Sequence, residues 1–126
     1  MIEKNKSPVS GIFPKLSSFR WSAKGLAYLF RREVNARFHL VAAVLVVAAG
    51  FIFSINTVEW LFITVAIVMV VAAEAFNTAV EMLVDKISPE FDQTMGRIKD
   101  VAAAGVLITA IGAAAIGIII FAPKIF

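Results

Sequence analysis

A long run without a charged residue, from Phe38 to Val58, is the feature that most constrains the fold of this chain. About 20 apolar residues in an α-helix, at about 1.5 Å per residue, cross a hydrocarbon core of about 30 Å. The composition points the same way, because 60% of the 126 residues are hydrophobic, whereas soluble domains contain about 45–50%. We therefore predict an integral membrane protein that forms a single domain over residues 1–126.

Two further apolar runs predict a second and a third span. The run Trp60–Ala73 is uncharged, and the sequence continues past Glu74 and Glu81 without a proline or a glycine that would stop a helix. The run Val101–Phe121 is almost entirely apolar, and we expect Pro123 to end that helix. The fold class is therefore an all-α membrane protein with three transmembrane helices, predicted over residues 35–57, 60–85 and 98–121.

The segment before the first span divides into two parts. Residues 1–14 contain two prolines and a glycine, which is typical of a flexible leader. In residues 17–33, apolar and basic side chains follow neighbouring stripes at helical spacing. This pattern predicts an N-terminal amphipathic helix that lies on the membrane surface.

The distribution of basic residues predicts the orientation in the membrane. Of the 12 lysines and arginines, eight precede the first span, and the connection Ser54–Glu59 has none. Cytoplasmic loops carry the excess of positive charge. We therefore expect a multi-pass protein of the inner (cytoplasmic) membrane, with the N-terminus and the second loop in the cytoplasm.

Four polar residues of the second span fall on one helical face. At about 100° per residue, Glu74, Asn77 and Asp85 all lie within about 40° of Glu81. A carboxylate inside a span costs roughly 2.5–3.5 kcal/mol on insertion scales, so it needs a reason. Interhelical hydrogen bonds that only hold a bundle together are one reason. A proton or cation path and a divalent metal held by oxygen ligands are the functional ones.

Other charges lie at the same predicted membrane level. Glu33 and Arg37 precede the first span, and Arg97, Lys99 and Asp100 precede the third. A surface ion pair is the simple interpretation of Glu33 with Arg37, and a helix N-cap that of Asp100. Together, acids suited to Mg²⁺ and cations suited to phosphate indicate a nucleotide site at the inner membrane face. Neither G-x-x-x-x-G-K-[ST] nor G-x-G-x-x-G occurs, so a kinase here must be built from helices alone.

Two segments carry a resemblance to a known family. Residues 74–85 read EAFNTAVEMLVD and residues 96–103 read GRIKDVAA. With these segments the chain resembles the prokaryotic integral-membrane diacylglycerol kinases and the related undecaprenol kinases, from about Trp21 to Pro123. The resemblance implies a homotrimer of three-span subunits, each with a surface helix. It also implies transfer of the γ-phosphoryl group of ATP to the hydroxyl of a membrane lipid.

The resemblance also implies roles for individual residues. Glu33 and Glu81 match Mg²⁺ ligands, Glu74 matches the candidate general base, and Asn77 matches the polar group beside it. The residues implied at the nucleotide are Trp21, Lys24, Asp85, Arg97, Lys99 and Asp100. The expected partners are MgATP, a membrane lipid alcohol, the bilayer and further copies of the chain, with no nucleic acid.

The acceptor and the competing functions stay open at this stage. The pairs Phe38-His39 and Glu59-Trp60 look more like the undecaprenol kinase branch, so the sequence leaves diacylglycerol and undecaprenol as alternatives. A small proton-coupled multidrug-type exporter and a purely structural membrane subunit are the competing classes. An exporter predicts one charge near the midplane, whereas the acids here cluster toward one side, and a structural subunit leaves Glu74 and Glu81 unexplained. For His39 we expect an interhelical hydrogen bond rather than a catalytic role.

Overall fold

A computed structural model describes residues 12–126 of the chain, with side chains from residue 16 onward. This part forms four helices and no strand: α1 (Ile12–Arg32), α2 (Val34–Ile52), α3 (Thr57–Ile87) and α4 (Gln93–Ile125). Three of them, α2, α3 and α4, are long and apolar enough to cross a membrane. The predicted all-α fold with three candidate spans and an N-terminal helix is confirmed.

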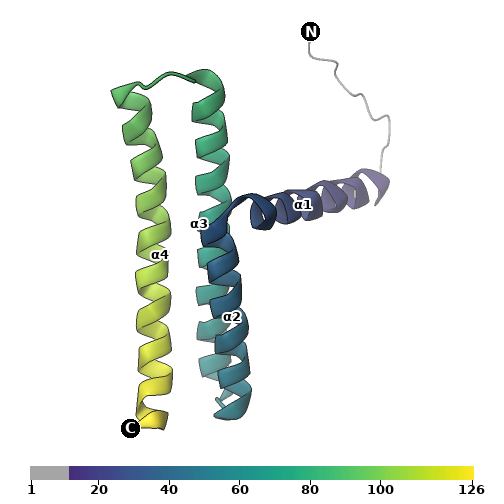
Figure 1. Cartoon of the computed structure of the whole chain (residues 1–126). Coiled ribbons are helices and arrows are strands. Elements are labelled where there is room, and N and C mark those ends of the chain that lie inside the picture. The colour runs from purple at the N-terminus through teal and green to yellow at the C-terminus, as the bar shows by residue number, and fades with distance from the viewer. Residues whose placement is uncertain (1–11) are drawn as a thin grey trace.

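The helices form an open arrangement rather than a closed bundle (Figure 1). The helices α3 and α4 run antiparallel as a long hairpin, while α2 packs along one half of α3. From the start of α2, α1 leaves the bundle at a wide angle. The elbow between α1 and α2 therefore lies against the middle of α3, where the acidic residues begin.

The elbow itself is a single non-helical residue, Glu33. Its φ of −99° and ψ of 116° are extended values, and its side chain makes no cap hydrogen bond to α2. The first helix starts at Ile12 and ends at Arg32, whereas the sequence predicts 17–33. Residues 12–14 of the expected leader are thus helical, and the rest of that leader lies outside the described residues.

The first span ends earlier than predicted, at Ile52 instead of residue 57. Ser54 has a φ of +50°, which breaks the helix, and Asn56 begins the next one with a capping box. The Asn56 side chain accepts from the Glu59 backbone N–H at 2.9 Å, and the Asn56 N–H donates to Glu59 at 2.9 Å. Such a reciprocal pair satisfies two backbone donors, so it fixes the start of α3 at Thr57.

The third span is longer than predicted at both ends. Asp92 is the N-cap, accepting from the Met95 N–H at 3.0 Å, so the interpretation of Asp100 as a cap is wrong. The expectation that Pro123 ends the helix is also wrong, since Pro123 lies inside α4. In the last turn a proline removes only one hydrogen bond, and the Phe126 N–H still donates to the Ala122 carbonyl at 3.0 Å.

A cluster of buried apolar side chains lies at the end of the molecule away from Glu74 and Glu81. Ile55, Ile63 and Ile120 form a small buried cluster there, joined by Trp60 and Phe121. Elsewhere most apolar side chains of α2, α3 and α4 face outward, and only 6% of the apolar window of α4 is buried. Such a surface suits contact with lipid or with further membrane helices.

A close approach of helices at Gly50 gives a stability prediction. A Cβ added to Gly50 would lie 2.6 Å and 2.9 Å from two ring atoms of Trp60. The indole ring packs on Phe51 with ring centroids 4.9 Å apart, so it has little room to move. We expect Gly50→Ala to destabilise the fold by about 1–3 kcal/mol, the usual cost of overpacking.

Thermal denaturation in detergent measures this effect. Gly25→Ala is the matched control, because a Cβ at Gly25 meets no atom within 4 Å. Equal denaturation midpoints for the two variants would contradict the prediction.

Candidate active site

The polar face of α3 begins at Glu74, which is buried. Glu74 is 3% exposed, although it lies within a helix that is long and apolar enough to cross a membrane. Its Oε1 atom is 3.2 Å from Nε2 of His39 on α2. The contact has the length of a hydrogen bond but not its angle, because Oε1 has no hydrogen-bond partner in the described part of the chain. A carboxylate is thus held at membrane depth beside one imidazole.

One turn further along α3, Asn77 and Thr78 continue this polar face. The Asn77 side-chain amide donates to Glu81 at 3.2 Å, while its carbonyl oxygen is buried with no hydrogen-bond partner among the described residues. The Thr78 hydroxyl is in the same situation. Buried polar groups are normally satisfied, so these atoms indicate a place that a ligand or water completes.

Toward the end of α3, the polar face turns to α4. Lys99 of α4 donates to Asp85 at 2.8 Å. The charge of Glu81 also attracts the Lys99 ammonium, and the charge of Arg32 repels it. The sequence therefore predicts correctly that Asp85 and Lys99 come from the same end of neighbouring helices, and the structure joins them in an ion pair.

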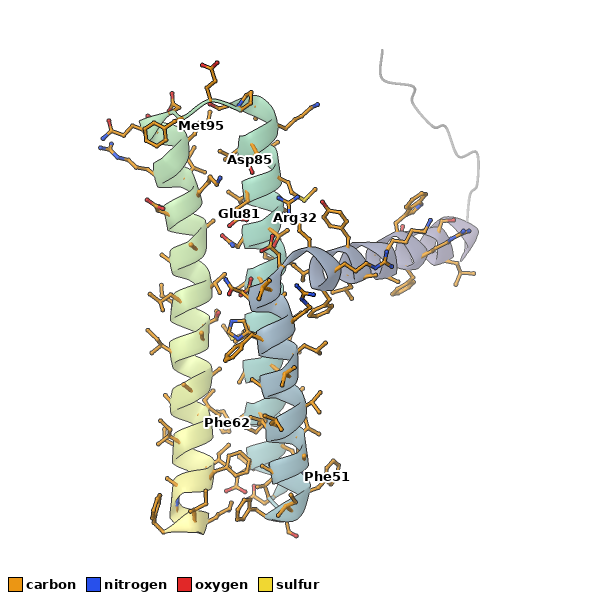
Figure 2. All side chains as sticks on the ribbon, in the orientation of Figure 1. Arg32, Phe51, Phe62, Glu81, Asp85 and Met95 are labelled. Atoms are coloured by element: carbon orange, nitrogen blue, oxygen red, sulfur yellow. The ribbon has the colours of Figure 1, made fainter. Side chains whose placement is uncertain are left out.

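The elbow brings a third set of charges to the same place. Arg32 contacts Glu33 at 3.2 Å and donates to the Tyr28 hydroxyl at 3.0 Å. Figure 2 shows Arg32 at the level of Glu81, with Asp85 beyond it along α3. Hydrogen bonding to Tyr28 raises the pKa of Arg32 above its ordinary value, so this cation keeps its charge. Glu33 pairs with Arg32 rather than with Arg37 as the simple interpretation had it.

The acids are close enough to act on one another. The charges of Glu33 and Glu81 both repel the carboxylate of Glu74. Since Glu33 comes from the elbow and Glu81 from α3, one chain assembles these three acids. We name Glu33, Glu74, Asn77, Glu81, Asp85 and Lys99, together with Arg32 and His39, the polar cluster.

The acids of the polar cluster are the type of ligand that Mg²⁺ prefers. No group of three or more His, Asp or Glu side chains in residues 12–126 is placed to hold a metal by itself. Mg²⁺ is usually bound through one or two carboxylates plus substrate phosphates and water. Glu33 and Glu81 supply two carboxylates, and the unpartnered oxygen of Asn77 lies beside Glu81.

Four of the residues implied at the nucleotide lie apart from the polar cluster. Trp21 and Lys24 contact each other on α1, with the ammonium 4.6 Å from the ring centroid, and α1 points away from the bundle (Figure 1). Arg97 and Asp100 are exposed on α4. Arg97 lies about 200° around the helix from Lys99, so it faces away from Asp85.

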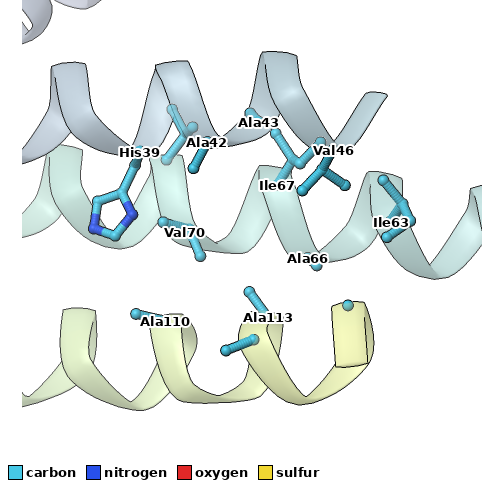
Figure 3. Close-up of a pocket in the computed structure, with 13 residues that line it drawn as sticks. His39, Ala42, Ala43, Val46, Ile63, Ala66, Ile67, Val70, Ala110 and Ala113 are labelled. Atoms are coloured by element: carbon cyan, nitrogen blue, oxygen red, sulfur yellow. The ribbon is translucent and has the colours of Figure 1, made fainter. Parts of the chain in front are cut away.

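A cavity lies between α2, α3 and α4, with His39 and Val70 at one end of it (Figure 3). Its volume is about 240 Å³, and His39 is the only strongly polar residue among the 13 that line it. Most of the others are small, including Ala42, Ala66 and Ala113. An apolar cavity with one polar end is the usual form of a site for an apolar ligand with one reacting group.

A second cavity, of about 150 Å³, lies at the loop between α3 and α4. Asp85, Glu90 and Asp92 line it, against a single cation, Lys99. This excess of negative charge disfavours a polyphosphate there.

Sequence reasoning did not assign two members of the polar cluster to the site. Arg32 served only as a topology signal. His39 was expected to contact another helix rather than to be catalytic, and it does contact Glu74 of α3. The available signal for His39 was its position, as a lone imidazole in an otherwise apolar run. Arg32 carried no comparable signal, because its contacts depend on the elbow at Glu33.

Comparison with known proteins identifies the family of this chain. The sequence matches the family described as prokaryotic diacylglycerol kinase over residues 20–121. An undecaprenol kinase of Bacillus subtilis (strain 168) is 34% identical over 108 residues, which cover 86% of this chain and 88% of that protein. A diacylglycerol kinase of Escherichia coli (strain K12) is 30% identical over 97 residues, which cover 77% of this chain and 78% of that protein.

A similar relationship holds for a third relative. A diacylglycerol kinase of Haemophilus influenzae (strain ATCC 51907 / DSM 11121 / KW20 / Rd) is 29% identical over 99 residues, covering 79% of this chain and 84% of that protein. The matched region contains the second half of α1, the elbow and the whole polar cluster.

Proposed function

The chain belongs to the prokaryotic diacylglycerol kinase family, and we propose that the polar cluster is its active site. Family membership makes the chain a membrane-embedded lipid kinase that uses ATP as phosphoryl donor. The exporter alternative has no support among these relatives. We propose diacylglycerol or undecaprenol as the acceptor, since relatives named for each are similar to this chain.

The observation that carries the site assignment is the buried Glu74, 3% exposed, beside His39, the polar residue that lines the apolar cavity. A lipid alcohol has to bring its hydroxyl to the reaction while its hydrocarbon stays out of water. Glu74 lies about 10 Å of helix rise from Glu81. This spacing along α3 lets a lipid meet one carboxylate and a nucleotide meet the other.

In the proposed reaction, the lipid hydroxyl oxygen forms a bond to the γ-phosphorus of ATP. The bond from that phosphorus to the oxygen bridging the β and γ phosphates breaks, and ADP leaves. Glu74 accepts the hydroxyl proton as general base, and Asn77 holds Glu81 in place through its amide. Phosphoryl transfer depends mainly on positioning and charge neutralisation, which a cluster on helices provides without a phosphate-binding loop.

Glu33 and Glu81 are the proposed residues for the magnesium ion. Bound there, Mg²⁺ would neutralise charge on the β and γ phosphate oxygens. Lys99 and Arg32 supply fixed positive charge on the same side of the polar cluster, and Asp85 orients Lys99 through the 2.8 Å ion pair.

Four residues outside the polar cluster are still proposed to bind the nucleotide, namely Trp21, Lys24, Arg97 and Asp100. They lie on exposed surfaces of α1 and α4. In a homotrimer, which we propose for this chain, a neighbouring subunit would bring its own copies of such surfaces near the polar cluster. The outward apolar faces of α2, α3 and α4 give the area for that assembly.

We propose that the protein lies in the inner membrane with the polar cluster facing the cytoplasm. Seven of its 12 lysines and arginines precede α2, and an eighth, Arg37, lies in the first turn of α2, as the positive-inside rule requires. The first helix would lie on the inner surface, because it leaves the bundle at a wide angle (Figure 1). ATP is available on that side.

Phosphoryl transfer from labelled MgATP, with diacylglycerol and undecaprenol offered in parallel in mixed micelles, tests the proposed function. We expect label in at least one of the two lipids. A folded protein that labels neither lipid and binds no nucleotide would overturn the proposal and return the acids of α3 to a structural role.

Lys99 gives a prediction for nucleotide affinity. We expect Lys99→Met to raise the KM for MgATP by about 10- to 100-fold, because a hydrogen bond to a charged group is worth about 1.5–3 kcal/mol. The kcat at saturating MgATP should fall much less. Titration of MgATP at fixed lipid measures both constants.

The matched control is Lys86→Met, at the end of α3. Lys86 is exposed and has no place in the proposed site, so its variant should keep the wild-type KM. Equal KM values for the Lys99 and Lys86 variants would remove Lys99 from the nucleotide.

A further inference from the structure

The single histidine of the chain occupies a position that the proposed reaction does not yet use. His39 lies on α2 with its Nε2 atom 3.2 Å from Oε1 of Glu74. The same imidazole is the strongly polar residue lining the apolar cavity. Figure 3 shows it at one end of that cavity, between α2 and α3. His39 therefore contacts both the Glu74 carboxylate and the apolar cavity.

The surroundings of Glu74 leave its carboxylate poorly held without His39. The charges of Glu33 and Glu81 repel it, and the imidazole of His39 lies 3.2 Å from its Oε1 atom. A buried carboxylate without a donor is costly, and Oε1 of Glu74 has no hydrogen-bond partner in the described part of the chain. An imidazole N–H is the group within reach that can select one orientation.

We propose that His39 is a positioning residue for phosphoryl transfer, holding Glu74 at the polar end of the cavity that receives the lipid chain. This inference rests on the proposed function, because it takes Glu74 as the base. Nε2–H of His39 directs one carboxylate oxygen, and the other oxygen is left to accept the proton of the lipid hydroxyl. The imidazole keeps its own proton and does not contact the γ-phosphoryl group.

The present angle between the two groups agrees with this role. Hydrogen bonds at active sites are often long or poorly aligned before substrate binds and tighten in the complex. A lipid chain that fills the cavity between α2, α3 and α4 would restrict the imidazole from below. Binding of the lipid chain in the cavity would then also align Glu74 for proton transfer.

Nitrogen NMR tests the contact without any activity measurement. Because the chain has one histidine, ¹⁵N-histidine labelling in micelles gives the signals of a single imidazole. We expect Glu74→Gln to shift the Nε2 resonance of His39, and Glu90→Gln, in the exposed loop, to leave it unchanged. An Nε2 resonance that is the same in wild type and Glu74→Gln would overturn the inference.

Kinetics then distinguish positioning from simple structural support. We expect His39→Leu to lower kcat about 100-fold, the cost of a misplaced reacting group, with the KM for MgATP unchanged. His39→Gln, whose amide can still donate to Glu74, should recover about tenfold of that loss. Val41→Ala, exposed on the same helix, is the control and should keep wild-type constants.

The outcomes separate this inference from the proposed function. Equal loss of kcat in His39→Gln and His39→Leu, or a raised KM for MgATP in both with kcat unchanged, would overturn the positioning role. Absence of lipid phosphorylation in the wild type would overturn the proposed function instead. In that case the NMR comparison would still decide whether His39 holds Glu74.

Discussion

Glu74→Gln is expected to lower kcat for lipid phosphorylation by about 10²- to 10⁴-fold, the usual contribution of a general base. The amide has the shape of the carboxylate but cannot accept the hydroxyl proton. Because Glu74 lies about 10 Å of helix rise from Glu81, the KM for MgATP should change little. Initial rates with saturating lipid and varied MgATP measure both constants.

The same substitution should leave the fold intact, which separates lost chemistry from lost structure. A neutral amide is cheaper to bury at membrane depth than a carboxylate. It also removes the repulsion from Glu33 and Glu81. The thermal midpoint in detergent should therefore stay at or above that of the wild type.

Glu90→Gln serves as the matched control for Glu74→Gln, since it makes the same chemical change in an exposed loop. It should keep both kcat and the thermal midpoint. A wild-type kcat in Glu74→Gln would show that another group takes the proton. The proposal that the polar cluster is the active site would then lose Glu74, the residue on which it rests.

The polar face of α3 could be predicted from the sequence because it depends on one period in one helix. No glycine or proline interrupts the chain between Trp60 and Asp85. The spacing of Glu74, Glu81 and Asp85 then fixes their common direction. The apolar runs fixed the number of spans for a similar reason, since length and hydropathy decide which helices can cross a bilayer.

The helix ends were harder to predict, because the apolar runs extend past the residues that cap the helices. Asn56 and Glu59 have the spacing of a capping box, but they follow an apolar run that reads as one continuous span. Asp92 caps α4 before the apolar residues begin. In both cases a short-range hydrogen bond, not the hydrophobic pattern, decides where the helix starts.

The partner of each side chain across a helix interface was beyond sequence reasoning. The pairing of His39 with Glu74 requires α2 to pack on a particular stretch of α3. The elbow at Glu33 has no glycine or proline to mark it, yet it carries Arg32 to the level of Glu81 (Figure 2). Interhelical register is a property of the packed molecule, so residues joined only by register could not be assigned beforehand.

Glu81→Gln should change how activity depends on magnesium. Loss of an outer-shell partner in a metal site costs about 10- to 100-fold, so loss of a direct carboxylate ligand should cost at least about 100-fold at a fixed, low Mg²⁺ concentration. Raising Mg²⁺ should restore part of the rate, because Glu33 and the nucleotide phosphates still offer oxygen ligands. Activity against Mg²⁺ at constant MgATP measures the shift.

Two comparisons make this result specific to metal binding. Glu33→Gln should shift the Mg²⁺ dependence in the same direction, because it removes the other proposed ligand. Glu74→Gln should lower the rate at every Mg²⁺ concentration without a shift, because its defect is in proton transfer. If Glu81→Gln also lowers the rate without a shift, Glu81 is not a metal ligand, and its hydrogen bond to Asn77 at 3.2 Å is then what makes it necessary.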